Sequence, residues 1–120
     1  MHPGSGHSRP VPFLSAEAAW FWTAHALRAA RDPSVRRPGP APCRVEDVMK
    51  CLDSLYRRRR IELLHARILR IWGARGVAPN PARVRERSDW RIWREAIERL
   101  EGPLRAQGIV AGPILQDAAD

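Results

Sequence analysis

Arginine is the residue type in this sequence whose number and spacing point to a chemical role. Residues 57–94 hold twelve arginines and three acidic residues, which is a net charge of +9. The complete chain of 120 residues carries +8, so its positive charge is concentrated in one third of its length. A guanidinium is planar and always charged, and it binds a phosphate or a guanine edge through two parallel hydrogen bonds. This concentration of charge favours an anionic partner, with nucleic acid ahead of a membrane surface.

These arginines divide into three candidate nucleic-acid-binding groups. Spacings of four and three residues place Arg87, Arg91 and Arg94 on one face of an expected helix, from which they can reach phosphates or base edges. The second group, Arg83 and Arg85, lies on a short helix expected just before it. The third group is a run of four at an earlier turn, which comprises Arg57, Arg58, Arg59 and Arg60. We expect the second and third groups to hold the flanking backbone phosphates.

A solvated helix surface in an arginine-rich protein is the competing interpretation. Twenty of the 21 basic residues are arginine, and codon usage in a GC-rich genome can produce that preference over lysine. Codon usage explains the choice of arginine, but it does not explain why the arginines cluster. The clustering is therefore the observation that favours a polyanion-binding role.

Other chemistries have little support in the sequence. Cys43, Cys51 and His65 match no zinc-binding spacing, and the common phosphate-loop, serine-hydrolase and zinc-protease motifs are absent. We therefore expect no metal, no cofactor and no enzymatic activity. Two thiols without metal spacing favour a reducing compartment. Because no segment resembles a membrane span or a signal peptide, we expect a cytoplasmic protein.

The apolar periodicity predicts an all-α fold, because no stretch alternates for long with the period of a strand. We expect a small bundle of four to five helices, which span about 15–31, 44–57, 60–72, 81–86 and 88–101. Residues 1–12 lack periodicity and predict a disordered leader. Four prolines and a glycine predict a stiff linker over 32–42. This linker separates an N-terminal helical segment (13–31) from a helical core domain (43–110), which a C-terminal tail (111–120) follows.

A turn is expected at the run of four arginines, although no glycine or proline marks it. Two apolar stripes flank this run. The first stripe is formed by Val45, Val48, Leu52 and Leu55. The second stripe is formed by Ile61, Leu64, Ile68 and Ile71. Because the second stripe is out of phase with the first, one straight helix cannot bury both, and the chain must turn or kink between them.

Residues typical of helix ends set the other boundaries. Ser15 and Ser88 are expected to cap the N-termini of the first and last helices. Gly73 or Gly76 is expected to adopt the left-handed conformation that ends the third helix, and the Gly102-Pro103 pair is expected to end or kink the last one. One stripe of the last helix is expected to face the core, and it comprises Trp90, Trp93, Ile97, Leu100 and Leu104.

Three consecutive aromatic residues in the first helix, Trp20, Phe21 and Trp22, broaden its apolar face beyond one third of its circumference. Burial in the core is the favoured interpretation. Docking on a protein partner or in a homodimer seam is the alternative, because tryptophan is common at interface hot spots. A membrane-surface role for residues 15–31 has less support because the polar face carries few cations, and we expect no membrane partner.

The helix order over residues 60–101 resembles that of small bacterial and phage helix-turn-helix regulators of the sigma-region-4 type. In these proteins a last helix rich in tryptophan and arginine reads DNA, and the matching segment here is Asp89-Trp90-Arg91-Ile92-Trp93-Arg94. The resemblance covers about a third of the chain and implies a DNA-binding transcriptional regulator. Our leading expectation is therefore a small basic helical protein that binds nucleic acid, with DNA favoured over RNA. The alternative is a non-catalytic protein-interaction module or a homodimeric adaptor.

Overall fold

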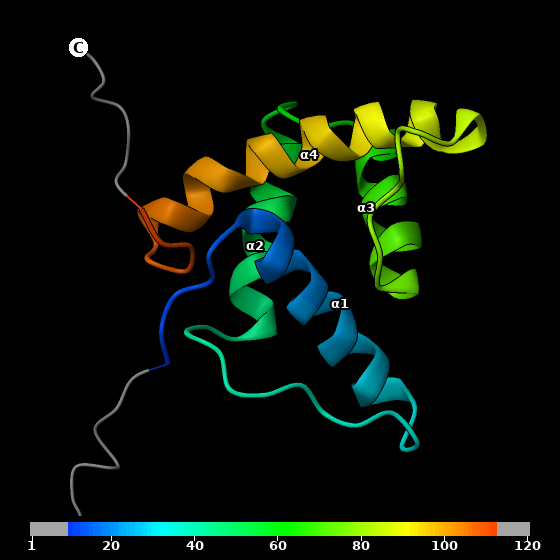
Figure 1. Ribbon diagram of the computed structural model, residues 1–120. Helices are drawn as coiled ribbons and strands as arrows, with labels where there is room; N and C mark the ends of the chain where they lie inside the picture. Colours follow the sequence, from blue (N-terminus) through cyan, green and yellow to red (C-terminus); the bar gives the residue numbers. More distant parts are fainter. Residues whose placement is uncertain (1–9, 113–120) are drawn as a thin grey trace, which may run out of the picture.

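Figure 1 shows the computed structural model, which describes residues 10–112. Within this range the fold is all-α, as predicted. The elements are α1 (Ala16–Arg31), α2 (Val45–Arg57), α3 (Leu63–Arg75), the short 3-10 helix η2 (Val84–Glu86) and α4 (Arg87–Ala106). Residues 1–9 of the predicted leader and residues 113–120 of the predicted tail lie outside the described residues. The prediction of a helix over the whole of 81–86 is wrong, because only the 3-10 helix η2 forms there, over Val84–Glu86.

Helix α4 runs across one end of the other three helices (Figure 1). It packs against α1, α2 and α3, and α1 in turn packs against α2 and α3. By contrast, α2 and α3 barely contact each other. The Pro-rich stretch 32–42 contains no helix and returns the chain from the end of α1 to the start of α2 (Figure 1). Because α1 contacts all three other helices, it is part of the same packed core.

The core lies where α4 meets the other helices. On α4, Trp93, Leu100 and Leu104 are buried, while Trp90 and Ile97 are half-buried. The predicted apolar stripe of this helix therefore faces inward. Trp93 packs against Phe21 of α1, with ring centroids 5.4 Å apart, and its indole N–H donates a hydrogen bond of 2.7 Å to Glu17. These contacts fix the rotation of α4, and that rotation determines which of its arginines face solvent.

Helix α1 approaches α3 closely. Ser15 caps α1 as predicted, because its hydroxyl oxygen accepts a hydrogen bond of 3.0 Å from the Ala18 N–H. The buried Trp20 donates its indole N–H to the Leu69 carbonyl at 2.8 Å. A Cβ atom at Gly73 would lie only 2.8 Å from Trp20 Nε1 and 3.0 Å from Ala24 Cβ. The absence of a side chain at Gly73 is therefore what allows the two helices to pack at this distance.

The expected turn at the four arginines is present, and a left-handed residue produces it. Arg59 has a φ of 61°. Its N–H donates to the Tyr56 carbonyl at 3.0 Å, and the Arg60 N–H donates to the Leu55 carbonyl at 2.8 Å. These two hydrogen bonds form a Schellman motif, which usually places glycine at the left-handed position. Ile61 follows the motif and is 2% exposed, so its burial offsets the unfavourable backbone conformation of Arg59.

Arg59→Gly should change the free energy of unfolding by less than about 0.5 kcal/mol, because relief of the left-handed backbone and the larger entropy of unfolded glycine oppose each other. Arg59→Val should lower it by more than about 1 kcal/mol, because a β-branched residue is poorly tolerated at positive φ. Urea denaturation of the three proteins measures both changes. Equal stability of the glycine and valine variants would contradict the left-handed assignment.

The predicted buried stripe of α3 is only half correct. Ile61 and Ile68 are buried, whereas Leu64 and Ile71 are 46% and 37% exposed. The helix begins at Leu63 and not at residue 60, and the face that it turns inward consists of His65, Ile68, Leu69, Trp72 and Gly73. Because this face starts with a polar residue, His65, the apolar pattern of the sequence did not reveal which side of the helix is buried. Of the two glycines predicted to end this helix, Gly76 is the one that adopts the left-handed conformation, with a φ of 76°.

His65 is a packed core-edge residue with both ring nitrogens occupied. Its Nδ1 accepts a hydrogen bond of 2.9 Å from the Glu62 N–H, so the proton is on Nε2, which donates to Glu95 Oε1 at 2.9 Å. This hydrogen bond holds the pKa of Glu95 below its ordinary value. The arrangement joins the start of α3 to the middle of α4, so His65 makes a structural contact between the two helices.

Helix α4 does not end at the Gly102-Pro103 pair, so that predicted boundary is wrong. Pro103 stands inside the helix, where its missing N–H leaves the Arg99 carbonyl without its helical donor. The helix continues because Leu104 is completely buried. Gly108 ends it, with a φ of 75° and a hydrogen bond of 2.9 Å from the Ile109 N–H to the Leu104 carbonyl. The N-terminus of α4 also differs from prediction, because the helix begins at Arg87 and Ser88 lies inside it.

The segment after α4 folds back onto the start of the chain. Ile109 and Val110 are buried. The Phe13 N–H donates to the Ile109 carbonyl at 2.9 Å, and the Ala111 N–H donates to the Phe13 carbonyl at 2.8 Å. The two ends of the described chain thus lie side by side next to α1 and α2 (Figure 1).

Candidate nucleic-acid interface

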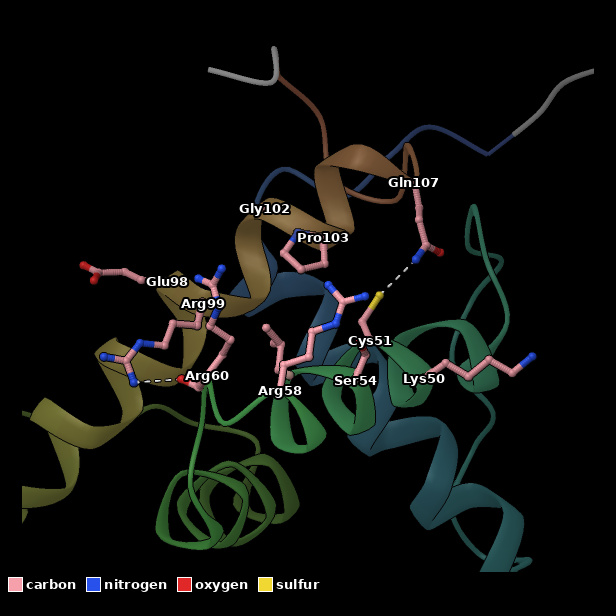
Figure 2. Close-up of a pocket in the computed structure, with 11 residues that line it drawn as sticks. Lys50, Cys51, Ser54, Arg58, Arg60, Glu98, Arg99, Gly102, Pro103 and Gln107 are labelled. Carbon is pink, nitrogen blue, oxygen red and sulfur yellow. Dashed lines mark hydrogen bonds between the residues drawn. The ribbon is translucent and has the colours of Figure 1, made fainter. Parts of the chain in front are cut away.

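A cleft of about 500 Å³ opens between α2 and α4, next to the α2–α3 turn (Figure 2). Four cationic side chains line it, and they are Lys50, Arg58, Arg60 and Arg99. Among residues 10–112, Glu98 is the only acidic residue that lines it, and its side chain points away from the cleft in Figure 2. The apolar and small residues of the wall include Cys51 and Leu55. The cleft is therefore a concave, positively charged site.

The Schellman motif places the four consecutive arginines on different surfaces. Arg58 and Arg60 line the cleft and extend from the turn toward α4 (Figure 2). Arg59 borders a different hollow, beside Tyr56 and Leu63. Arg57 is still helical and forms an ion pair of 3.0 Å with Asp53 on its own helix. The left-handed residue thus directs two of the four predicted arginines into one concave site.

Helix α4 leaves room for the cleft at the Gly102-Pro103 pair, which forms part of its wall. Gly102 has no side chain, and apart from its chain neighbours and the backbone of its own helix no atom lies within 4 Å of the position that a Cβ would occupy. Arg99, one turn earlier, donates a hydrogen bond of 3.0 Å to the Arg60 carbonyl. This contact ties the turn to α4 and brings the two sources of positive charge together.

The positive charge of the cleft is available to a ligand. Glu98 forms an ion pair of 3.0 Å with Arg94, and both side chains are more than half exposed. Among residues 10–112, the side chains of Lys50, Arg58 and Arg60 form no ion pair within 4.0 Å of a carboxylate. A concave wall of protein excludes water from one side of such charges and strengthens their field toward an anion. The geometry is therefore suited to a phosphate group.

The cysteine in the cleft wall is not a nucleophile of this site. Cys51 Sγ accepts a hydrogen bond of 3.2 Å from Gln107 Nε2, as Figure 2 shows. Burial raises the pKa of the Cys51 thiol and also that of the Cys43 thiol. A raised pKa keeps a thiol protonated and unreactive. The Cys51 thiol is therefore a poor nucleophile at neutral pH.

The predicted face of Arg87, Arg91 and Arg94 is exposed on α4, but two of its members have internal partners. Arg94 pairs with Glu98 and also lies 5.4 Å from the centroid of the Trp90 ring. Arg87 donates its Nε–H to the Pro81 carbonyl at 3.2 Å. An exposed ion pair contributes only about 0–1 kcal/mol, so a phosphate can replace the carboxylate. The face remains available to an anion, with Arg91 as its freest member.

The remaining predicted contacts lie near the N-terminus of α4. Arg83 has an exposed side chain that lies 3.6 Å from the half-buried carboxylate of Glu86. Arg85 is exposed on η2. Neither residue lines the cleft between α2 and α4. The structure therefore places two of the predicted arginines, Arg58 and Arg60, in the cleft, and the arginines of η2 and the start of α4 on an exposed surface outside it.

The aromatic cluster of α1 is largely used inside the protein. Trp20 is 4% exposed, so it is not available for docking on a partner. Phe21 is half-buried against Trp93, and Trp22 is half-buried against Phe13 with ring centroids 5.8 Å apart. The Trp22 indole also donates to the Gly39 carbonyl at 3.0 Å, which fastens the Pro-rich linker to α1.

Two cationic residues of the cleft, Lys50 and Arg99, were not among the predicted contacts. Lys50 is the single lysine of the chain, and Arg99 stands between the acidic residues Glu98 and Glu101. Neither residue lies within the arginine-rich stretch 57–94. No local pattern connects them, because they line the same cleft only through the packing of α4 against α2.

Comparisons with known proteins give no independent indication of function. No protein-family model matches this chain, and no curated protein or solved structure shows a significant match. None of the helices in the described part of the chain combines the length and the apolar content needed to cross a membrane.

Proposed function

We propose that this protein binds nucleic acid, and that the cleft between α2 and α4 holds a backbone phosphate. The observation that carries the proposal is that Arg58 and Arg60 extend toward α4 across a concave site that Lys50 and Arg99 also line, while Glu98 points away from it. Guanidinium groups bind phosphate oxygens through two parallel hydrogen bonds. Half or more of the hydrogen bonds between proteins and DNA go to the sugar-phosphate backbone.

The exposed arginines of α4 extend this surface along the helix. From Arg99 to Arg87 the helix rises about 18 Å at 1.5 Å per residue. That length corresponds to about five base pairs at 3.4 Å each. A duplex lying along α4 can therefore place one phosphate in the cleft and others near Arg91 and Arg87. This extended contact supports duplex DNA as the favoured partner.

Binding to the backbone has more support than reading of a base sequence by a helix-turn-helix. That motif joins two helices by a turn of three or four residues, and its second helix enters the major groove. Here α3 and α4 are separated by residues 76–86, in which η2 is the only helical element. The resemblance to sigma-region-4 regulators thus extends to a small helical domain whose last helix exposes several arginines. A regulatory role remains part of the proposal and rests on that resemblance alone.

A salt titration of the full chain tests the proposal. The logarithm of the binding constant should fall with the logarithm of salt concentration by about 0.9 per phosphate contact. Four contacts predict roughly a hundredfold loss of affinity between about 50 mM and about 200 mM salt. Fluorescence anisotropy with labelled random-sequence DNA and RNA duplexes measures both slopes. Undetectable binding to both duplexes at about 50 mM salt would overturn the proposal.

A further inference from the structure

A second concave surface lies between α1, α2 and α3, and its chemistry differs from that of the cleft. α2 and α3 both pack against α1 and α4, but they barely contact each other. Two adjoining hollows of about 290 Å³ and 270 Å³ occupy the space between them. Both hollows are lined by Met49, Leu52 and Ala66, so they form one continuous groove. α1 contributes Trp20, Ala24 and Leu27 to its wall.

Apolar side chains at one end of this groove are exposed to solvent. Tyr56 is 48% exposed and Leu63 is 70% exposed, and both line the second hollow. Met49 and Leu27, which line the first, are half-buried. Exposed apolar residues that adjoin a groove are typical of binding surfaces, whereas single exposed apolar residues are common on any protein. Tyr56 and Leu63 adjoin an apolar groove, so they indicate a binding surface.

The other end of the groove is positively charged. Arg28, Arg31 and Arg70 line the first hollow, and no acidic residue of the described part of the chain lines it. Arg28 is fixed in place because its guanidinium donates to the Gly73 and Ala74 carbonyls at 3.2 and 2.9 Å. The one acid of the second hollow, Asp53, is paired with Arg57. The groove therefore combines an apolar wall with a net positive rim.

We propose that this groove binds an amphipathic helix of another protein, with an apolar stripe flanked by acidic residues. A helix fits because α2 and α3 are neighbours of α1 without closing on each other, so the space between them has the walls of a helix-packing site. Apolar residues at spacings of three and four would enter the groove. The acidic residues would pair with Arg31 and Arg70 at the rim.

The same features argue against the other occupants. A nucleic-acid backbone would have to place phosphates against Leu27, Met49 and Leu52, which supply no donor. A second copy of this chain is also a poor match, because the helices within residues 10–112 turn their apolar stripes inward toward one another. An acidic helix from a different protein satisfies both the apolar wall and the positive rim.

The test uses two fluorescein-labelled helical peptides of about 18 residues, long enough for a helix to form on binding. One carries leucines at spacings of three and four with glutamates on the flanks, and the other has lysines in place of the glutamates. The glutamate peptide should bind the full chain at least tenfold more tightly than the lysine peptide. The proposal is wrong if the glutamate peptide does not bind at millimolar concentration, or if both peptides bind equally.

Protein variants then locate the binding surface. Arg31→Gln with Arg70→Gln should weaken binding of the glutamate peptide at least tenfold. The matched control, Arg36→Gln with Arg37→Gln, removes the same charge from the exposed linker and should change binding less than twofold. An equal loss in both variants would show attraction by net charge alone and overturn the proposal. Nucleic-acid affinity, measured on the same proteins, reports separately on the cleft, because neither Arg31 nor Arg70 lines it.

Discussion

Gly73→Ala should lower the free energy of unfolding by about 1–3 kcal/mol, the usual effect of inserting a methyl group into a closely packed contact. The new Cβ would lie 2.8 Å from Trp20 Nε1 and 3.0 Å from Ala24 Cβ. Trp20 is a rigid, buried ring whose N–H already bonds to Leu69 at 2.8 Å. It can therefore move only by weakening that hydrogen bond or by separating α1 from α3.

Gly102→Ala is the matched control, because it is the same substitution inside another helix. Gly102 is exposed, and apart from its chain neighbours and the backbone of its own helix no atom lies within 4 Å of its Cβ position. This variant should change the free energy of unfolding by less than about 0.5 kcal/mol, because the better helix propensity of alanine is opposed by the contact of its Cβ with the ring of Pro103. Urea denaturation should therefore show a clear loss of stability for Gly73→Ala and little change for Gly102→Ala. Stabilisation by both substitutions would contradict the close contact between α1 and α3.

Arg58→Gln combined with Arg60→Gln should weaken binding to a random-sequence DNA duplex on the order of a hundredfold at about 50 mM salt. The two side chains line the cleft and extend toward α4. Removing two phosphate contacts should also reduce the salt slope by about two units. Both residues are exposed, so the free energy of unfolding should change by less than about 0.5 kcal/mol.

The control for this variant removes the same charge from a different surface. Arg36 and Arg37 are exposed in the linker between α1 and α2 and do not line the cleft. Arg36→Gln with Arg37→Gln should reduce DNA affinity only a few fold, through the smaller net charge. Fluorescence anisotropy over a range of salt concentrations separates the two effects. Equal losses of affinity and slope would mean that the protein attracts DNA without a located site.

The fold class and most helix positions could be predicted because they depend on local patterns. Apolar spacing marked α1, α2 and α4, Ser15 marked the start of α1, and the change of phase marked the turn after α2. The errors arose where burial prevailed over local preference. Pro103 favours a helix end, but Leu104 must reach the core, so α4 continues to Ala106. His65 is a polar residue on the buried face of α3, and Glu62 and Glu95 satisfy both of its nitrogens.

The candidate site could be predicted only in part, for a related reason. The density of arginine identified Arg58 and Arg60, since charge clusters are read directly from the sequence. The sequence also predicted a binding face on α4, because helical spacing aligns Arg87, Arg91 and Arg94. The sequence could not show that α4 crosses the end of α2 and brings Arg99 to the Arg60 carbonyl. That crossing depends on long-range contacts such as the one between Trp93 and Glu17.

The most direct test of the cleft as a phosphate site is a nuclear magnetic resonance titration of the arginine Nε–H signals. The full chain, labelled with ¹⁵N, is titrated with a short random-sequence DNA duplex at low salt. The proposed interface predicts that the Arg58 and Arg60 signals shift first and furthest, followed by that of Arg91, while the Arg36 and Arg37 signals move little. Largest shifts at Arg36 and Arg37, or no shifts at Arg58 and Arg60 when the DNA is bound, would contradict it.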